Sequence, residues 1–237
     1  MSRFPRARLF PLTLFFLILL LLWDASGIDL VLARAMGTPL GFPWRHNWFL
    51  VDVIHEGGKA LSWALLMALF IAIARPFGFL RRLGRRDRVQ LALATLASVT
   101  VITLMKRASS TSCPWDLQAF GGMAHYVSHW SWGLRDGGGG NCFPAGHASA
   151  AFAYVGGYFV WRRTSPAVAR AWLASALVAG LVFGLAQQWR GAHFMSHTLW
   201  TAWLCWVTGY AVDAGMQWSA RRRSGSAPVV ASLAKAE

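Results

Sequence analysis

Three groups of polar residues stand out in a chain that is otherwise rich in apolar side chains. They are Lys106-Arg107 with Cys113-Pro114, Pro144-Ala145-Gly146-His147, and Arg190-Gly191-Ala192-His193 with His197. Ionisable groups at membrane depth are costly and are usually kept for function. Cationic side chains together with two or three imidazoles indicate a site that binds a phosphate group and attacks it.

The cationic residues are expected to neutralise the phosphate. A phosphate monoester carries close to two negative charges, which repel an attacking nucleophile. Lys106 can act as a point charge, and Arg190 can donate two hydrogen bonds to phosphate oxygens; Arg107 is a further candidate. Gly146 lets the backbone approach the anion closely, at the start of a predicted helix whose N–H groups favour negative charge.

The histidines are expected to carry the chemistry. A neutral His193 can attack phosphorus and form a phosphohistidine. His147 heads the predicted helix, where the positive helix end should lower its pKa until bound phosphate restores it, as suits a proton donor. His197 follows one helical turn after His193 and is expected to orient it through a hydrogen bond. This scheme requires no metal ion and no cofactor.

Composition and charge indicate a membrane protein. Of 237 residues, 56% are hydrophobic and only 14% are charged, far fewer than in a soluble domain. The formal net charge is +14, but the arginines lie in short runs between apolar segments, which is the positive-inside pattern of a multi-pass membrane protein. No surface of interleaved aromatic and basic residues is evident, so nucleic acid is not an expected partner. The arginine runs are Arg3/Arg6/Arg8, Arg81 to Arg88, Arg162/Arg163/Arg170 and Arg221 to Arg223.

Apolar segments predict an all-α bundle of six transmembrane helices. Crossing a bilayer takes about 20 helical residues. The arginine runs place both termini in the cytoplasm and the three polar groups at the periplasmic end of a bacterial inner-membrane protein. Residues 1–223 form the predicted membrane domain and residues 224–237 a disordered cytoplasmic tail. The segments are roughly 9–33, 57–79, 89–106, a short 147–161, 171–189 and 195–215.

The N-terminus has an alternative interpretation. A basic start, the apolar run from Leu9 to Trp23 and the small residues around Ala33 resemble a signal peptide with a cleavage site. Because the apolar stretch resumes at Ile28, it is long for a signal, and an even number of crossings fits better if it stays. We therefore expect it to be retained as the first helix.

The outer loop 107–143 is expected to be functional because long loops in compact proteins often are. It holds the glycine run 137–140 and two of the three cysteines. In an oxidising periplasm Cys113 and Cys142 are expected to form a disulfide, with two free thiols as the alternative. Cys205 lies in the last apolar segment and is expected to be a small buried side chain.

Two further polar clusters are ambiguous. Asp52, His55, Glu56 and Lys59 lie near the start of the second segment. They fit an ordinary interfacial helix start, and the alternative is a carboxylate that supports the active site. His125 and His129 have the i, i+4 spacing of helical metal ligands, but no cysteine or carboxylate supports them, which favours a structural role and no metal site.

The three polar groups together resemble the motifs of the type-2 phosphatidic acid phosphatase superfamily. Its first motif is Lys, six residues, Arg-Pro, which matches Lys106 and Pro114. Its second is Pro-Ser-Gly-His, similar to the stretch that ends at His147. Its third is Arg, five residues, His, three residues, Asp, and His193 with His197 keeps the latter spacing. The resemblance implies a six-helix, metal-independent phosphatase in which Lys106 and Arg190 bind phosphate, His147 is the general acid and His193 the nucleophile.

The departures from these motifs bear on the implied roles. Cys113 stands where the motif has an arginine, so one phosphate contact is missing, and Arg107 is expected to supply it. Ala145 removes a hydroxyl donor, and His197 replaces the carboxylate that orients the nucleophile, so no fixed negative charge stands there. Arg190 lies three residues before His193 instead of six. An alternative alignment takes His197, seven residues after Arg190, as the nucleophile.

The sequence therefore predicts a lipid phosphatase. Its partners would be the membrane and a lipid phosphate: an isoprenyl (pyro)phosphate, a lipid A phosphate or a glycerophospholipid. Two alternatives remain open at this point. A phosphohistidine can pass its phosphoryl group to a second lipid instead of water, and the altered motifs also suit a non-catalytic protein that binds anionic lipid. The oligomeric state is not readable from the sequence.

Overall fold

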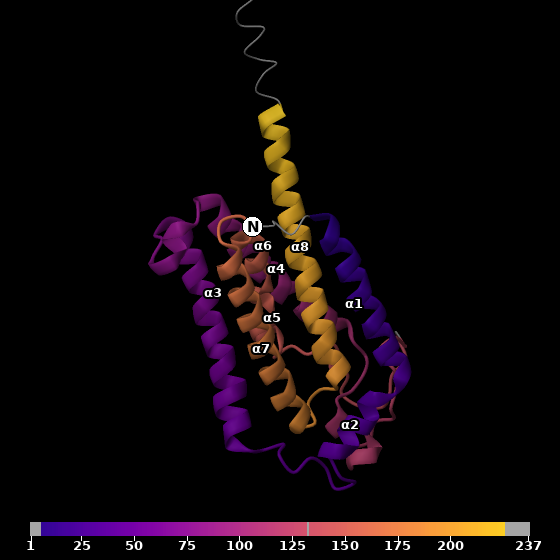
Figure 1. Ribbon diagram of the computed structural model, residues 1–237. Helices are drawn as coiled ribbons and strands as arrows, with labels where there is room; N and C mark the ends of the chain where they lie inside the picture. Colours follow the sequence, from indigo (N-terminus) through magenta and orange to yellow (C-terminus); the bar gives the residue numbers. More distant parts are fainter. Residues whose placement is uncertain (1–5, 132, 226–237) are drawn as a thin grey trace, which may run out of the picture.

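The computed structural model describes residues 6–131 and 133–225, and within these ranges its regular secondary structure is helical, with loops and two isolated β-bridges between the helices. The long helices pack side by side in a bundle (Figure 1). In chain order the α-helices are α1 (Arg6–Ser26), α2 (Ile28–Met36), α3 (Gly58–Ala74), α4 (Arg85–Ala108), α5 (Ser149–Phe152), α6 (Gly157–Trp161), α7 (Pro166–Trp189) and α8 (Met195–Gly225). A π-helix, η1 (Phe49–Gly57), leads into α3, and 3₁₀ segments are η2 (Gly78–Arg82), η3 (Pro114–Asp116), η4 (Gln118–Phe120) and η5 (Ala153–Gly156).

Four helical stretches are long and apolar enough to cross a membrane, which indicates a multi-pass membrane protein. The two other predicted crossings do not meet that criterion. The stretch from α5 to α6 is short, and α8 carries more polar residues. A count of six crossings therefore stays a prediction. The four stretches are Leu9–Ser26, Phe49–Arg82, Arg85–Ala108 and Pro166–Trp189.

The first and last helices differ from the predicted segments. The first segment breaks at Gly27, whose φ of 69° lies in the left-handed region that glycine adopts without steric cost, so the chain turns into α2. The last helix runs on past residue 215 to Gly225. The predicted tail at 224–237 thus begins inside α8, and from residue 226 on it lies outside the described residues.

The short helical stretch from α5 through η5 to α6 is buried inside the bundle, against α4, α7 and α8. Close approach depends on small residues, as is common in membrane helix packing. A Cβ added to Gly156 would lie 2.7 Å from the Cβ of Ala94 and 3.7 Å from the Cα of Gly209. This central stretch carries the second polar group at its start, so the bundle interior fixes the position of His147.

Buried polar side chains join α4, α6 and α8 near the arginine-rich end. The fully buried Asp213 accepts hydrogen bonds from Arg162 at 3.0 Å and Gln90 at 3.0 Å. Arg163 bonds both Asp213, at 2.5 Å, and Asp87, at 2.7 Å. A buried carboxylate is tolerated only when it is paired and hydrogen-bonded in this way.

The two ends of the bundle differ in chemistry. The described chain begins and ends at the same end of the bundle (Figure 1), and the turns with Arg81, Arg82, Arg162 and Arg163 follow helices that finish there. The connections from α2 to η1, from α4 to α5 and from α7 to α8 lie at the opposite end (Figure 1). The three polar groups of the sequence therefore meet at one end, away from these arginines.

Candidate active site

The last turn of α4 brings Lys106 against the second polar group. A Cβ added to Gly146 would lie 3.3 Å from Cδ and 3.6 Å from Cε of Lys106, so the glycine leaves room for the lysine stem. Arg107 is exposed, and it is not among the charges that act on His147 or His193. Because successive helical residues point in different directions, the helix that positions Lys106 turns Arg107 away. The structure thus does not bring Arg107 to the predicted phosphate site.

The turn before α5 is held by α8. The N–H of Ala145 donates to the carbonyl oxygen of His197 at 3.2 Å, and the Thr201 hydroxyl donates to the carbonyl oxygen of Ala145 at 3.1 Å. In the same turn the Ser149 hydroxyl donates to the carbonyl oxygen of Gly146 at 2.6 Å. These bonds fix the backbone on either side of His147.

His147 lies against a residue that the sequence placed only in an ambiguous cluster. The rings of His147 and His55 are 3.6 Å apart at an interplanar angle of 30°. Nδ1 of His55 is 2.9 Å from Oε1 of Glu56, whose other oxygen is 2.5 Å from Nζ of Lys59. Glu56 therefore contacts His55, which in turn lies against His147. The supporting-carboxylate alternative stays a prediction. Asp52 is exposed on the same π-helix.

Arg190 ends α7 and is held by three partners. Its Nε donates to the carbonyl oxygen of Arg45 at 3.1 Å, and its Nη1 donates to Oε1 of Gln187 at 3.1 Å. Its guanidinium lies 6.0 Å from the ring centroid of Trp115, over which Arg45 also lies at 4.5 Å. Gln187 lies six residues before His193, at the position of the arginine in the motif of the phosphatase superfamily. Through its hydrogen bond to Gln187, the Arg190 side chain reaches back one helical turn toward that position.

His193 lies in the connection between α7 and α8 and is only 4% exposed. Burial lowers its pKa well below the ordinary value, and the charges of Lys106, His197 and His147 act in the same direction. A low pKa keeps the imidazole neutral, as a nucleophile must be. These electrostatic interactions also show that the three polar groups of the sequence converge on one site.

The expected hydrogen bond between His193 and His197 is absent among the described residues. The ring centroids are 5.7 Å apart, and Nδ1 of His197 is buried without a partner. His197 instead packs edge-on against Phe143, Phe194 and His129, at 5.3, 5.4 and 5.6 Å. The prediction that His197 orients His193 by a direct hydrogen bond is therefore wrong in geometry, because Nδ1 of His193 faces a different group.

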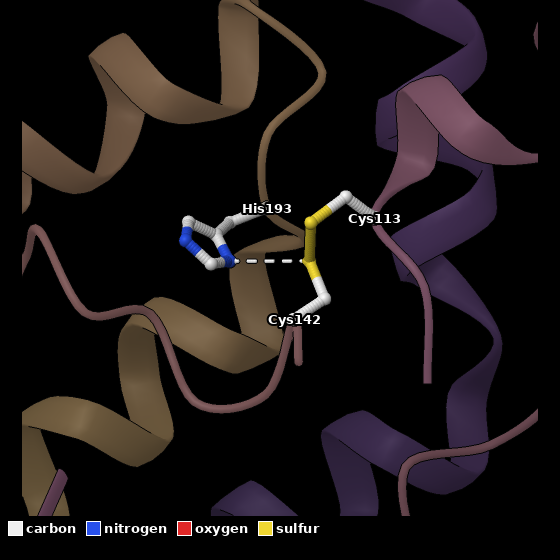
Figure 2. A group of neighbouring side chains, drawn as sticks. All are labelled: Cys113, Cys142 and His193. Carbon is white, nitrogen blue, oxygen red and sulfur yellow. Dashed lines mark hydrogen bonds between the residues drawn. A yellow bond between two sulfur atoms is a disulfide. The ribbon is translucent and has the colours of Figure 1, made fainter. Parts of the chain in front are cut away.

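That group is a disulfide, which confirms the predicted pairing. Cys113 and Cys142 are joined with an S–S distance of 2.14 Å. Sγ of Cys142 lies 3.5 Å from Nδ1 of His193 (Figure 2). The loop between the cysteines is anchored by the buried Asp136, which accepts bonds from the Ser112 N–H at 2.6 Å and from the Ser112 hydroxyl at 2.8 Å.

His125 and His129, the pair spaced i, i+4 in the outer loop, lie in different surroundings, and His129 has a carboxylate neighbour that the sequence did not indicate. His125 is exposed, and His129 stacks on Phe143 with centroids 4.1 Å apart. Nε2 of His129 is 3.4 Å from Asp24, which also accepts hydrogen bonds from the indoles of Trp130 and Trp200 at 2.9 and 2.8 Å. Residues 125–129 are not helical, so their spacing carries no helical meaning, and the structural role is favoured.

A cavity of about 210 Å³ opens from His147 between α3, α4 and α5. Its lining combines charged and polar side chains, among them Lys59, Thr103 and His147, with apolar side chains such as Leu66 and Val99. A cavity with both kinds of lining suits an amphiphile.

The pKa of His147 bears on how the predicted reaction should depend on pH. Burial and the charges of His55, Lys106, Arg190 and Lys59 lower the pKa of His147 to about 3, in the turn before α5. A group with a lowered pKa stays neutral above that value, so at neutral pH the free site holds no imidazolium at His147. For the phosphatase reaction that the sequence predicts, the proton for the leaving group would then arrive with a phosphate monoanion, whose pKa is about 6.

We therefore expect kcat/KM to be flat from about pH 5 to pH 6 and to fall above about pH 6, as the substrate loses its proton. Initial rates across a constant-ionic-strength buffer series would measure this profile. An acidic limb near the ordinary histidine pKa of about 6.5 would contradict it.

Comparison with known protein families gives one match. It is to the PAP2 superfamily and covers residues 88–221, which is more than half of the chain and includes all three polar groups. Comparisons with curated proteins and with solved structures give no significant match. The matched region begins in α4, so His55 and the cavity wall on α3 lie outside it. With two cations and two imidazoles gathered at one end of a helical bundle, this chain belongs to the PAP2 superfamily, whose members are phosphatases.

Proposed function

We propose that the protein is a metal-independent lipid phosphatase that works through a phosphohistidine at His193. The observation that supports this most directly is the convergence of the buried His193 and the half-buried His147 with Lys106 and Arg190. Nucleophile, proton donor and phosphate-binding charges are then supplied by side chains of this chain alone. The proposed substrate is a phosphate monoester or pyrophosphate of a membrane lipid, either isoprenyl, lipid A or glycerophospholipid.

The proposed reaction has two steps. Nε2 of His193 attacks phosphorus and forms an N–P bond, while the bond from phosphorus to the lipid oxygen breaks and that oxygen takes a proton through His147. Water then attacks the phosphohistidine, loses a proton to His147 and releases inorganic phosphate. Lys106 and Arg190 offset the charge on the phosphate oxygens in both steps.

The arrangement of the bundle supports a substrate held in a bilayer. The cavity next to His147 is lined by apolar and polar side chains of α3 and α4, and a lipid chain would lie there with its phosphate beside His147. Because the clustered arginines lie at the opposite end of the bundle, the positive-inside tendency favours a site that faces the periplasm of a bacterial inner membrane.

The test is phosphate release from a panel of lipid phosphates by the purified protein in detergent with excess chelator. We expect release from at least one isoprenyl, lipid A or glycerophospholipid substrate, and much slower release from a water-soluble sugar phosphate. Strict dependence on an added divalent metal would contradict the mechanism. Transfer of phosphate only to an added acceptor lipid, with no release to water, would show a phosphotransferase instead.

A further inference from the structure

The disulfide occupies the position from which the nucleophile would be oriented. In the phosphatase superfamily, a carboxylate four residues after the nucleophilic histidine orients that histidine. Here the residue at this position is His197, which makes no hydrogen bond to His193 in the described structure. Nδ1 of His193 instead faces Sγ of Cys142 at 3.5 Å, while the other ring nitrogen points away from the disulfide (Figure 2).

The surroundings of this contact are closed. His193 is 4% exposed and Cys142 is fully buried. The same sulfur lies 3.1 Å from the carbonyl oxygen of Ala192, one residue before His193. The His193 ring and the backbone of Ala192 therefore both contact the disulfide. Charged and titratable groups that act on His193 come from α4, from the turn before α5 and from α8, and they are Lys106, His147 and His197.

The His193 ring interacts with both the sulfur and the backbone of Cys142, and the chemistry of the sulfur at Nδ1 favours one position for the ring proton. A disulfide sulfur has no hydrogen and can only accept a hydrogen bond. Contact with Nδ1 is therefore favourable when Nδ1 carries the proton, and the lone pair then lies on Nε2. A neutral imidazole is fixed in one tautomer by the hydrogen bond that its other nitrogen makes.

We propose that the Cys113–Cys142 disulfide is the positioning group that holds His193 in the Nδ1–H tautomer, with Nε2 free to attack phosphorus. The catalytic consequence rests on the proposed function, whereas the tautomer itself is a property of the folded chain. Cys142 acts only through His193 and does not touch substrate.

Reduction reverses this preference. A dithiol or phosphine reductant supplies two electrons, the S–S bond breaks, and each sulfur takes a proton. The thiol of Cys142 can then donate to Nδ1 of His193, which favours a proton on Nε2 and removes the attacking lone pair. Oxidised and reduced protein should therefore differ in the tautomer of one histidine.

The test is nitrogen NMR of the full-length protein, labelled with ¹⁵N-histidine, in detergent before and after treatment with a phosphine and chelator. The His193 resonances are assigned as those missing from a His193→Gln sample. We expect Nδ1–H in the oxidised protein and a shift toward Nε2–H after reduction. An Nε2–H tautomer in the oxidised protein, or an unchanged tautomer on reduction, would overturn the proposal.

Kinetics provide the second measurement. Reduction should lower kcat by about tenfold or more with little change in KM, as expected for a nucleophile in the wrong tautomer. The control is Cys205→Ser, which removes the buried free thiol away from the site and should leave both the activity and the response to reductant unchanged. Chelator in all samples keeps metal off the freed thiols and His193, which lie within 4.8 Å of one another.

Cys113→Ser/Cys142→Ser separates positioning from general stability. A serine hydroxyl can donate or accept, so we expect a mixed tautomer and intermediate kcat even where thermal unfolding matches that of the reduced protein. If reduction lowers only the unfolding temperature and leaves the tautomer as it was, the disulfide is purely structural. A tautomer change in a protein without phosphatase activity would overturn the proposed function and leave this inference standing.

Discussion

His193→Ala is expected to lower phosphate release from a lipid phosphate by about 10⁴-fold or more, because it removes the nitrogen that we propose forms the covalent intermediate. The effect should fall on kcat, since Lys106 and Arg190, the proposed phosphate-binding residues, remain in place. Steady-state phosphate release measures it, and His125→Ala is the matched control because that histidine is exposed in the outer loop.

A chemical trap gives the same prediction an independent readout. Acid-labile, base-stable phosphate on the protein after rapid mixing with radiolabelled substrate should be present in the wild type and absent in His193→Ala. Full activity in His193→Ala would overturn the nucleophile assignment. If His193→Ala retained the phosphate label and His197→Ala lost it, the alternative alignment would be favoured.

Lys106→Ala is expected to slow turnover by about 10²-fold or more, the cost of losing one preorganised charge at a developing phosphoryl group. The stem of Lys106 lies beside Gly146, and its charge acts on both His147 and His193. Measurements of kcat and KM on the same lipid substrate would show the loss.

Arg107→Ala is the informative comparison, because the two cations are adjacent in sequence. Its side chain is exposed, and we expect less than about a threefold change, as for an ordinary surface substitution. Equal losses in the two variants would show that Arg107 does contact the phosphate, as the sequence alone predicted.

The sequence predicted the features that depend on local pattern. Long apolar stretches located α3, α4 and α7 within a few residues, because hydrophobic length depends only on composition. The Cys113–Cys142 pair followed from an outer loop with two cysteines. Lys106, His147 and His193 were chosen by residue type and spacing, and the bundle brings them together. Their roles remain predictions.

What the sequence could not predict depends on contacts between distant segments. His55 and His147 are 92 positions apart, and their ring contact requires the exact pairing of η1 with the turn before α5. The i, i+4 pair of His55 and Lys59 was the available signal, but it did not identify a partner. The contact of Cys142 with His193 likewise depends on how two loops meet, and no spacing rule contains it.

Arg190 shows how spacing alone can mislead. Its distance of three residues from His193 departs from the family motif, although the sequence still predicted phosphate binding for it. In the structure the side chain reaches back to Gln187, at the motif position, because residues three apart on a helix are neighbours. Side-chain length here makes up for a shift in backbone position.

The two guanidinium groups over Trp115 have a practical consequence. Arg45 and Arg190 lie 4.5 and 6.0 Å from that indole, so its emission spectrum depends on where their charges sit. A bound anion that draws Arg190 off the ring would alter the fluorescence, and subtracting the signal of Trp115→Phe would isolate this one indole from the other 13 tryptophans. The protein thus carries an intrinsic optical reporter of occupancy, which allows ligand affinity to be titrated without turnover and without a dye.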